Sequence, residues 1–361
     1  MADGILDEAY ERLHDSGPER EGWLSNHAPM AVEALARHGH DTDIHAWIDW
    51  YTPKLEDMPR RYEPIDADRW REALGDPRRI ADWVDLLTGS VADTPWRTVL
   101  ATWWPRLLPG IAAGATHGVI RVGHAVRTLL SGDESPAAVA ELGHALAYWA
   151  ARWQAVPGVN LAAVGGTLTP DTALDHVPVL PHQSGGIRER LARLDSLIGT
   201  GSSSEVVSWP DSLAAGAPPD DPAWARDWLA DLVDAAVRRY RYFGYGSPVM
   251  LVHSATAPNA VLRTLPALPR ELWVPSVGAA WAASAAVTSV YTPDRPVPPG
   301  DLAAPPSGHD PVRELLDRAA AHRGEHVIKL VDTAVDVHER TGDPDALAAA
   351  ASAIELMSED S

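Results

Sequence analysis

Apolar residues at helical spacing recur along most of this chain, and signals for β-strands are scarce. Residues 5–14, 28–38, 115–130, 136–153 and 325–341 each carry apolar side chains three or four positions apart. This spacing matches the period of an α-helix rather than the alternation of a strand. The sequence therefore predicts an all-α fold.

Three segments interrupt this pattern and are expected to be long loops. Residues 154–185, 197–221 and 292–311 are rich in Gly, Pro, Ser or Asp, which favour turns and irregular backbone. Loops of this length in a helical domain often surround a functional site. The 361 residues leave room for two domains, but no boundary or repeat stands out. We predict one large helical domain over residues 1–361.

The charge of the chain excludes several classes of partner. Fifty acidic against 30 basic residues give a formal charge of −20, whereas binding to nucleic acid or to anionic membranes depends on clustered Lys and Arg. No apolar run reaches the ~20 residues that a membrane-spanning helix needs. The N-terminus lacks the basic and apolar segments of a signal peptide. We expect a cytoplasmic protein that binds neither nucleic acid nor membranes.

Several common chemistries are also absent from the sequence. There is no Cys, which excludes disulfides, thiolate metal sites and a Cys nucleophile. Dinucleotide-binding, P-loop, H-E-x-x-H and G-x-S-x-G motifs are missing. Glu141-Leu-Gly-His144 is a single E-x-x-H motif, and a di-iron bundle needs two. Any metal must be held by His nitrogen and by oxygen ligands.

Four histidines in apolar or tightly packed sequence are the candidate metal ligands: His27, His117, His253 and His326. One such His alone is more often a hydrogen-bonded core residue, but burying four requires four sets of partners, and imidazole is the commonest metal-binding side chain. We therefore predict that the four converge on one ion. His124 and His144 are expected to line a pocket. The histidines in polar sequence are expected to be solvated: His14, His38, His40, His45, His309 and His338.

Lys329 is the fifth candidate ligand. Only two of the 30 basic residues are lysines, and Lys329 lies three positions after His326 in a helical segment, so both share one face. Only an amine can deprotonate or react, which Arg cannot do. Lys329 would bind a metal as a neutral amine or, as we prefer, as a carbamate formed with CO2. The alternative is that Lys329 extends to solvent or pairs with Asp332.

These residues resemble the questin oxidase-like family over residues 25–345. The resemblance lies in Asn26-His27 before an apolar helix, His117-Gly-Val-Ile-Arg-Val-Gly followed by Ala140-Glu141, Met250-Leu-Val-His253, and Glu325-His-Val-Ile-Lys329. The chain departs from the family pattern at Arg121, where a second His is usual, and at His124, where an aromatic residue is common. We select Lys329, His124 and Arg121 as candidate catalytic residues.

The resemblance implies a helical oxygenase that acts on an anthraquinone or related aromatic polyketide. The expected reaction is oxidative ring cleavage or Baeyer–Villiger-type insertion of oxygen at iron(II), with NADPH considered as an external reductant. The expected partners are O2 and the aromatic substrate, and a homodimer is considered. Trp103 and Trp104 are expected to belong to the core more than to a substrate platform. Two other functions stay open: a non-catalytic binding protein for an aromatic metabolite, and a zinc hydrolase with the same ligands.

Overall fold

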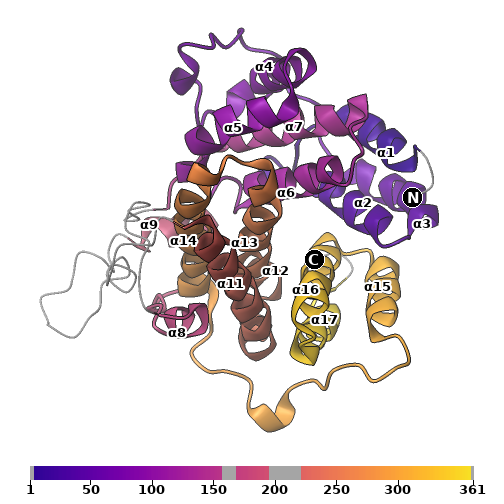
Figure 1. Cartoon of the computed structure of the whole chain (residues 1–361), viewed down its shortest axis with the longest axis vertical. Helices are drawn as coiled ribbons and strands as arrows, with labels where there is room; N and C mark the ends of the chain where they lie inside the picture. The colour runs from indigo at the N-terminus through magenta and orange to yellow at the C-terminus, as the bar shows by residue number, and fades with distance from the viewer. Residues whose placement is uncertain (1–3, 157–167, 195–220, 359–361) are drawn as a thin grey trace, which may run out of the picture. The chain divides into compact units, whose positions relative to one another are not determined.

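Helices form almost all of the regular structure, which confirms the predicted all-α fold. The computed structural model describes residues 4–156, 168–194 and 221–358 (Figure 1). Within these ranges the only strands are the two-residue β1 (Glu19–Arg20) and β2 (Leu24–Ser25), which pair antiparallel with Glu19 opposite Ser25. None of the helices in the described part of the chain is both long and apolar enough to cross a membrane.

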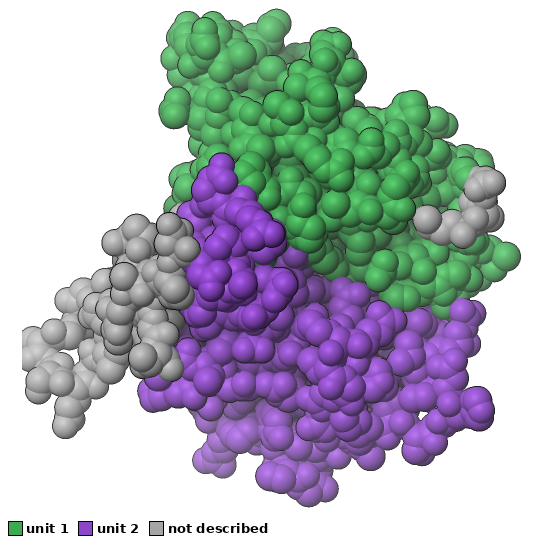
Figure 2. All heavy atoms as spheres, viewed as in Figure 1, with its two compact units in different colours: residues 1–155, 263–269 green, residues 156–262, 270–361 purple. Residues whose placement is uncertain are grey.

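The chain divides into two compact units, coloured separately in Figure 2. Unit 1 comprises residues 1–155 and 263–269, and unit 2 comprises residues 156–262 and 270–361. Each unit therefore contains residues that are far apart in the sequence. The prediction that residues 1–361 form one domain stays a prediction.

Unit 1 contains seven α-helices among its described residues. They are α1 (Ile5–His14), α2 (Ala28–Arg37), α3 (Asp41–Tyr51), α4 (Ile80–Asp93), α5 (Trp96–Leu107), α6 (His117–Leu130) and α7 (Pro136–Ala151). Short 3-10 helices connect or extend them: η1 (Thr52–Lys54), η2 (Trp70–Glu72), η3 (Pro77–Arg79), η4 (Leu108–Gly110) and η7 (Leu265–Ala267).

Helix α7 is the centre of unit 1, because it packs against both α4 and α6. Small residues permit this close approach. A Cβ atom on Gly118 of α6 would lie 2.9 Å from Trp149, and one on Gly143 would lie 2.9 Å from the Cα of Thr88 on α4. Glycine at these positions therefore sets the distance between the helices.

Tryptophans fill the space between these helices. The rings of Trp104 and Trp149 meet edge to face with centroids 5.4 Å apart, and Trp103 packs in the same way against Trp70 and Trp83. Trp103 and Trp104 are both buried. This confirms the expectation that they belong to the core.

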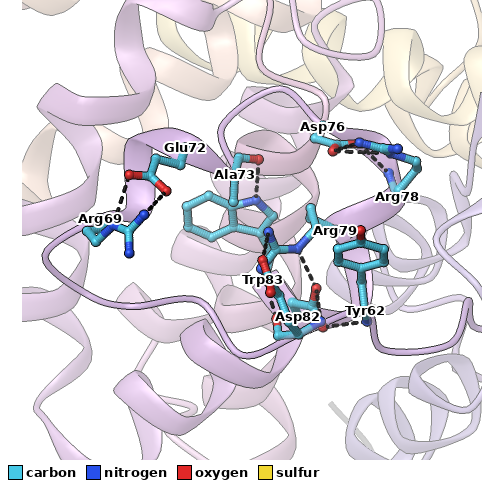
Figure 3. A network of polar contacts seen from close by, with 10 residues as sticks. Tyr62, Arg69, Glu72, Ala73, Asp76, Arg78, Arg79, Asp82 and Trp83 are labelled. Atoms are coloured by element: carbon cyan, nitrogen blue, oxygen red, sulfur yellow. Dashed lines mark hydrogen bonds and ion pairs between the residues drawn. The ribbon is translucent and has the colours of Figure 1, made fainter.

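A buried carboxylate holds the segment that leads into α4 (Figure 3). Asp82 accepts hydrogen bonds from the backbone N–H groups of Tyr62 and Glu63, at 2.9 and 3.2 Å, and pairs with Arg79 at 2.6 Å. The Trp83 indole donates to the carbonyl of Ala73 at 3.1 Å. These contacts provide hydrogen-bond partners for backbone groups that have no partner within a helix.

Unit 2 contains the remaining α-helices of the described chain: α8 (Pro170–Asp175), α9 (Ile187–Ala192), α11 (Pro222–Phe243), α12 (Pro248–Leu251), α13 (His253–Thr264), α14 (Trp273–Tyr291), α15 (Pro311–His322), α16 (Glu325–Thr341) and α17 (Pro344–Leu356). Arg263 and Thr264 at the end of α13 belong to unit 1. The 3-10 helices are η6 (Gly244–Gly246), η8 (Arg270–Leu272) and η9 (Pro299–Asp301). Helix α16 lies beside α17, and α11 packs against α14 and α17 (Figure 1).

The expected loops differ in outcome. Residues 292–311 are irregular apart from η9, as expected. Segment 154–185 contains α8, because the Thr169 side chain caps its N-terminus and Pro170 occupies the first helical position. Residues 157–167 and most of the loop expected at 197–221 lie outside the described residues.

Candidate metal-binding histidines

All four candidate histidines lie at the start of a helix. His27 is the N-cap residue of α2, His117 and His253 are the first residues of α6 and α13, and His326 is the second residue of α16. Their exposed fractions are 6% or less. The positive end of the helix dipole opposes protonation of a nearby imidazole. Metals bind the neutral form of imidazole.

In unit 1, His27 and His117 contact each other directly. Their Nε2 atoms are 2.7 Å apart and their rings are inclined by 66°. Nδ1 of His117 donates to the carbonyl of Gly114 at 2.6 Å, so Nε2 of a neutral His117 carries the lone pair. The hydrogen between the two Nε2 atoms must then be bonded to Nε2 of His27. The two rings thus form a directed N–H···N hydrogen bond.

Tyr51 supports this arrangement from the other side of His27. Its hydroxyl accepts from the backbone N–H of His27 at 3.1 Å and donates to the ring Nδ1 at 3.4 Å. Tyr51 is buried and stacks on Trp47, with ring centroids 4.7 Å apart. If Nε2 of His27 were to bind a cation, the ring proton would move to Nδ1 and donate to the Tyr51 oxygen instead.

The pair fits a metal after a small separation of the rings. Two nitrogens that are each 2.1 Å from one ion lie about 3.0 Å apart in an octahedral site and about 3.4 Å apart in a tetrahedral one, compared with 2.7 Å here. A cation would replace the shared hydrogen. Second-sphere hydrogen bonds of the kind made by Gly114 and Tyr51 accompany metal-binding histidines in general.

In unit 2, His253 and His326 form the second pair. Their ring centroids are 5.4 Å apart, with planes inclined by 65°. Nδ1 of His253 donates to the carbonyl of Met250 at 3.0 Å, which leaves the Nε2 lone pair for another partner. Burial, and secondly the charge of Lys329, lower the pKa of His253 to about 3. His253 is therefore neutral at ordinary pH.

The break between α12 and α13 places His253 at a helix start. Ser254 donates its hydroxyl to the carbonyl of Leu251 at 2.7 Å. Pro258 has no N–H to satisfy the carbonyl of Ser254, and the Ser284 hydroxyl of α14 does so instead, at 2.7 Å. Packing against α14 thus compensates for a proline inside α13.

Lys329 is 1% exposed. The alternative in which its side chain extends to solvent is therefore wrong, because this face of α16 is buried, whereas pairing with Asp332 stays a prediction. In its ammonium form it lowers the pKa of His253. A buried Lys near imidazoles is unusual, because burial disfavours the ammonium form. Its roles as a ligand and as a catalytic residue stay predictions.

The structure thus describes two histidine pairs, one within each unit. His27 and His117 are 90 residues apart in sequence and meet in unit 1. His253 and His326 meet in unit 2. That all four bind one ion stays a prediction.

Arg121 and His144 belong to a buried polar network in unit 1. Arg121 donates twice to Glu141, at 2.6 and 2.8 Å, and His14 contacts the same carboxylate at 2.8 Å. The His14 and His144 rings stack with centroids 4.0 Å apart. Burial alone would raise the pKa of Glu141, but Arg121 and His14 outweigh it and lower the pKa to about 2.

His124 belongs to a second network. Its Nδ1 contacts Glu33 at 2.6 Å, and Arg127 pairs with both oxygens of the same carboxylate. Burial would raise the pKa of Glu33, yet Arg127 and His124 lower it to about 2. Arg121 and His124 therefore each have a carboxylate partner that accounts for their burial, and their catalytic roles stay predictions.

Of the histidines expected to be solvated, His40 is buried and His14 is largely buried. His40 is 6% exposed, and the side chain of His14 is 15% exposed. His14 lies one turn after Tyr10 on the apolar face of α1, a spacing that could have identified it. Glu33 was also missed, although a single acid inside the apolar helix 28–37 is a signal for a buried ion pair.

A surface cavity of about 370 Å³ lies in unit 2, apart from these residues. Its walls carry the ion pairs Arg238–Asp171 and Arg239–Asp175, at 2.9 and 2.5 Å, beside Phe243. Its lining includes no candidate site residue and combines charged with apolar side chains. It does not match the apolar pocket expected for a flat aromatic substrate.

Compared with known proteins, the chain matches no family model and no curated protein. The resemblance to the questin oxidase-like family therefore stays a prediction that depends on the motifs alone.

Proposed function

We propose that this protein is a mononuclear non-haem iron oxygenase that acts on a quinone-like aromatic polyketide. The observation that carries the proposal is the His27–His117 pair, because two buried imidazoles with facing Nε2 atoms have the chemistry of a half-formed metal site. Positions at helix N-termini and fixed Nδ1 partners support ligation. The class of substrate and the reaction are drawn from the family resemblance.

The proposed ligands are His27, His117, His253 and His326, with Lys329 as a carbamate. Bound iron(II) would supply the redox chemistry needed for reaction with O2. The carbamate would add the anionic oxygen that neutral imidazoles lack. Oxygen insertion of the Baeyer–Villiger type places one oxygen atom in the substrate and reduces the other to water. This step needs two electrons per O2 beyond those that the substrate supplies, and NADPH is the proposed external reductant. Insertion of both oxygen atoms needs no external reductant. We also propose a cytoplasmic location and a homodimer.

Metal analysis of protein purified without chelator tests this proposal. We expect about one iron per chain, and we expect it to be lost in His27→Ala and in His117→Ala. The control is His309→Ala, since His309 is exposed on the connector before α15. Stoichiometric zinc would support the hydrolase instead. No metal above the level of the histidine variants would support the non-catalytic binding protein.

Substitution of Lys329 tests the carbamate. Lys329→Arg keeps a positive charge but can neither deprotonate nor react with CO2, so we expect loss of metal and of O2-dependent turnover. Lys329→Ala should also lose turnover, and bicarbonate or a short carboxylate should partly restore it. Full metal content and turnover in Lys329→Arg would exclude Lys329 as a ligand.

A further inference from the structure

The backbone directly before His117 is left-handed at three successive residues. Gly114, Ala115 and Thr116 have φ angles of 52°, 57° and 71°. This conformation is strained at a residue with a side chain, and such strain persists only where the surroundings impose it. The contacts of this turn therefore indicate which groups hold the backbone in this conformation.

The turn presents the carbonyl of Gly114 to His117. That oxygen accepts from the backbone N–H of His117 at 3.2 Å and from its ring Nδ1 at 2.6 Å. A carbonyl can only accept, so Nδ1 must carry the hydrogen and Nε2 must carry the lone pair. The position of one carbonyl thus sets both the tautomer and the orientation of the ring.

Ser25 and Tyr148 hold that carbonyl. Their hydroxyl oxygens are 2.5 Å apart, and Ser25 donates to the Gly114 carbonyl through a long hydrogen bond of 3.4 Å. A Cβ atom at position 114 would lie 2.7 Å from the Tyr148 hydroxyl and 3.2 Å from the Ser25 hydroxyl. Both side chains are buried. The turn is therefore held by direct contact as well as by hydrogen bonding.

We propose that Ser25 and Tyr148 are positioning residues that fix His117 as an Nε2 ligand through the carbonyl of Gly114. Ser25 belongs to β2 and Tyr148 to α7, so two separate elements determine the orientation of the His117 ring. The proposal rests on the proposed metal site. Loss of an outer-sphere partner of a metal-binding His typically weakens metal affinity by about 10–100-fold.

The first test compares Tyr148→Phe and Ser25→Ala with the wild type. Histidine 15N–1H correlation spectra of metal-free protein report which ring nitrogen carries the hydrogen, and His117→Gln identifies the His117 signals. We expect an Nδ1–H tautomer in the wild type and a mixture of tautomers in both variants. We also expect affinity for Fe(II), measured by chelator competition, to fall by about 10–100-fold.

The second test uses a matched pair of glycines in unit 1. Gly132 has a φ of 96° and nothing within 4 Å of an added Cβ, whereas Gly114 has a φ of 52° and the two hydroxyls in contact. Gly132→Ala measures the cost of the backbone conformation alone. We expect Gly114→Ala, but not Gly132→Ala, to change the His117 tautomer and to weaken Fe(II) binding.

The outcomes separate the two proposals. Wild-type tautomer and affinity in Tyr148→Phe, Ser25→Ala and Gly114→Ala together would overturn the positioning role. If the wild type binds no metal but its His117 tautomer changes in these variants, the proposed function fails and the positioning of the ring stands.

Discussion

At the scale of single residues, the buried ion pair between Arg121 and Glu141 offers the sharpest prediction. Glu141→Gln leaves the Arg121 charge buried without its counter-charge, which typically costs about 3–5 kcal/mol of unfolding free energy. The double variant Arg121→Met/Glu141→Leu removes both charges and should lose much less, as measured by urea denaturation of the wild type and both variants. Undiminished turnover in a folded double variant would show that Arg121 is not catalytic.

The lowered pKa of His144 predicts that the stability of the fold depends on pH. Burial, followed by the charges of His14 and Arg121, lowers its pKa to about 3. In the unfolded chain the pKa is about 6.5, so below that pH the unfolded state binds the extra proton. Stability should then fall as the pH is lowered from about 6.5 towards 3, by about 1.4 kcal/mol per pH unit for this residue. Chemical denaturation at pH 6.5 and 4.5 should show a smaller loss in His144→Gln; an unchanged loss would contradict the assignment.

At the scale of the elements, capping side chains stabilise the start of a helix, and α15 provides a test. The exposed Asp310 accepts a hydrogen bond from the backbone N–H of Arg313 at 2.9 Å. Asp310→Ala should therefore destabilise unit 2 by about 1 kcal/mol, while Asp310→Asn keeps the acceptor and most of the stability. Equal thermal midpoints for the wild type and the Ala variant would exclude a capping role.

At the scale of the whole molecule, the excess of 20 negative charges governs association. Repulsion from phosphates should prevent binding to duplex DNA at physiological salt, and lowering the salt should strengthen the repulsion. A gel-shift assay with a basic DNA-binding protein as positive control checks this. A shift of the DNA by this protein would show that a local basic patch outweighs its net charge.

The sequence by itself determined most of the helices, because helical period, proline and capping side chains act within a few residues. The expected helix at 325–341 is observed as α16, and the side chain of Asp221 caps α11. The sequence also identified the candidate ligands His27, His117, His253 and His326, because an imidazole in an apolar segment is costly to bury without a polar partner.

Only the tertiary structure decided which of these groups meet. His27 approaches His117, and Arg121 approaches Glu141, through contacts between separate helices. The partners His14 and Glu33 and the left-handed turn at residues 114–116 follow from that packing too. Local patterns set the conformation of a segment, whereas the partner of a buried polar group depends on which surfaces pack together. Neighbouring residues do not contain that information.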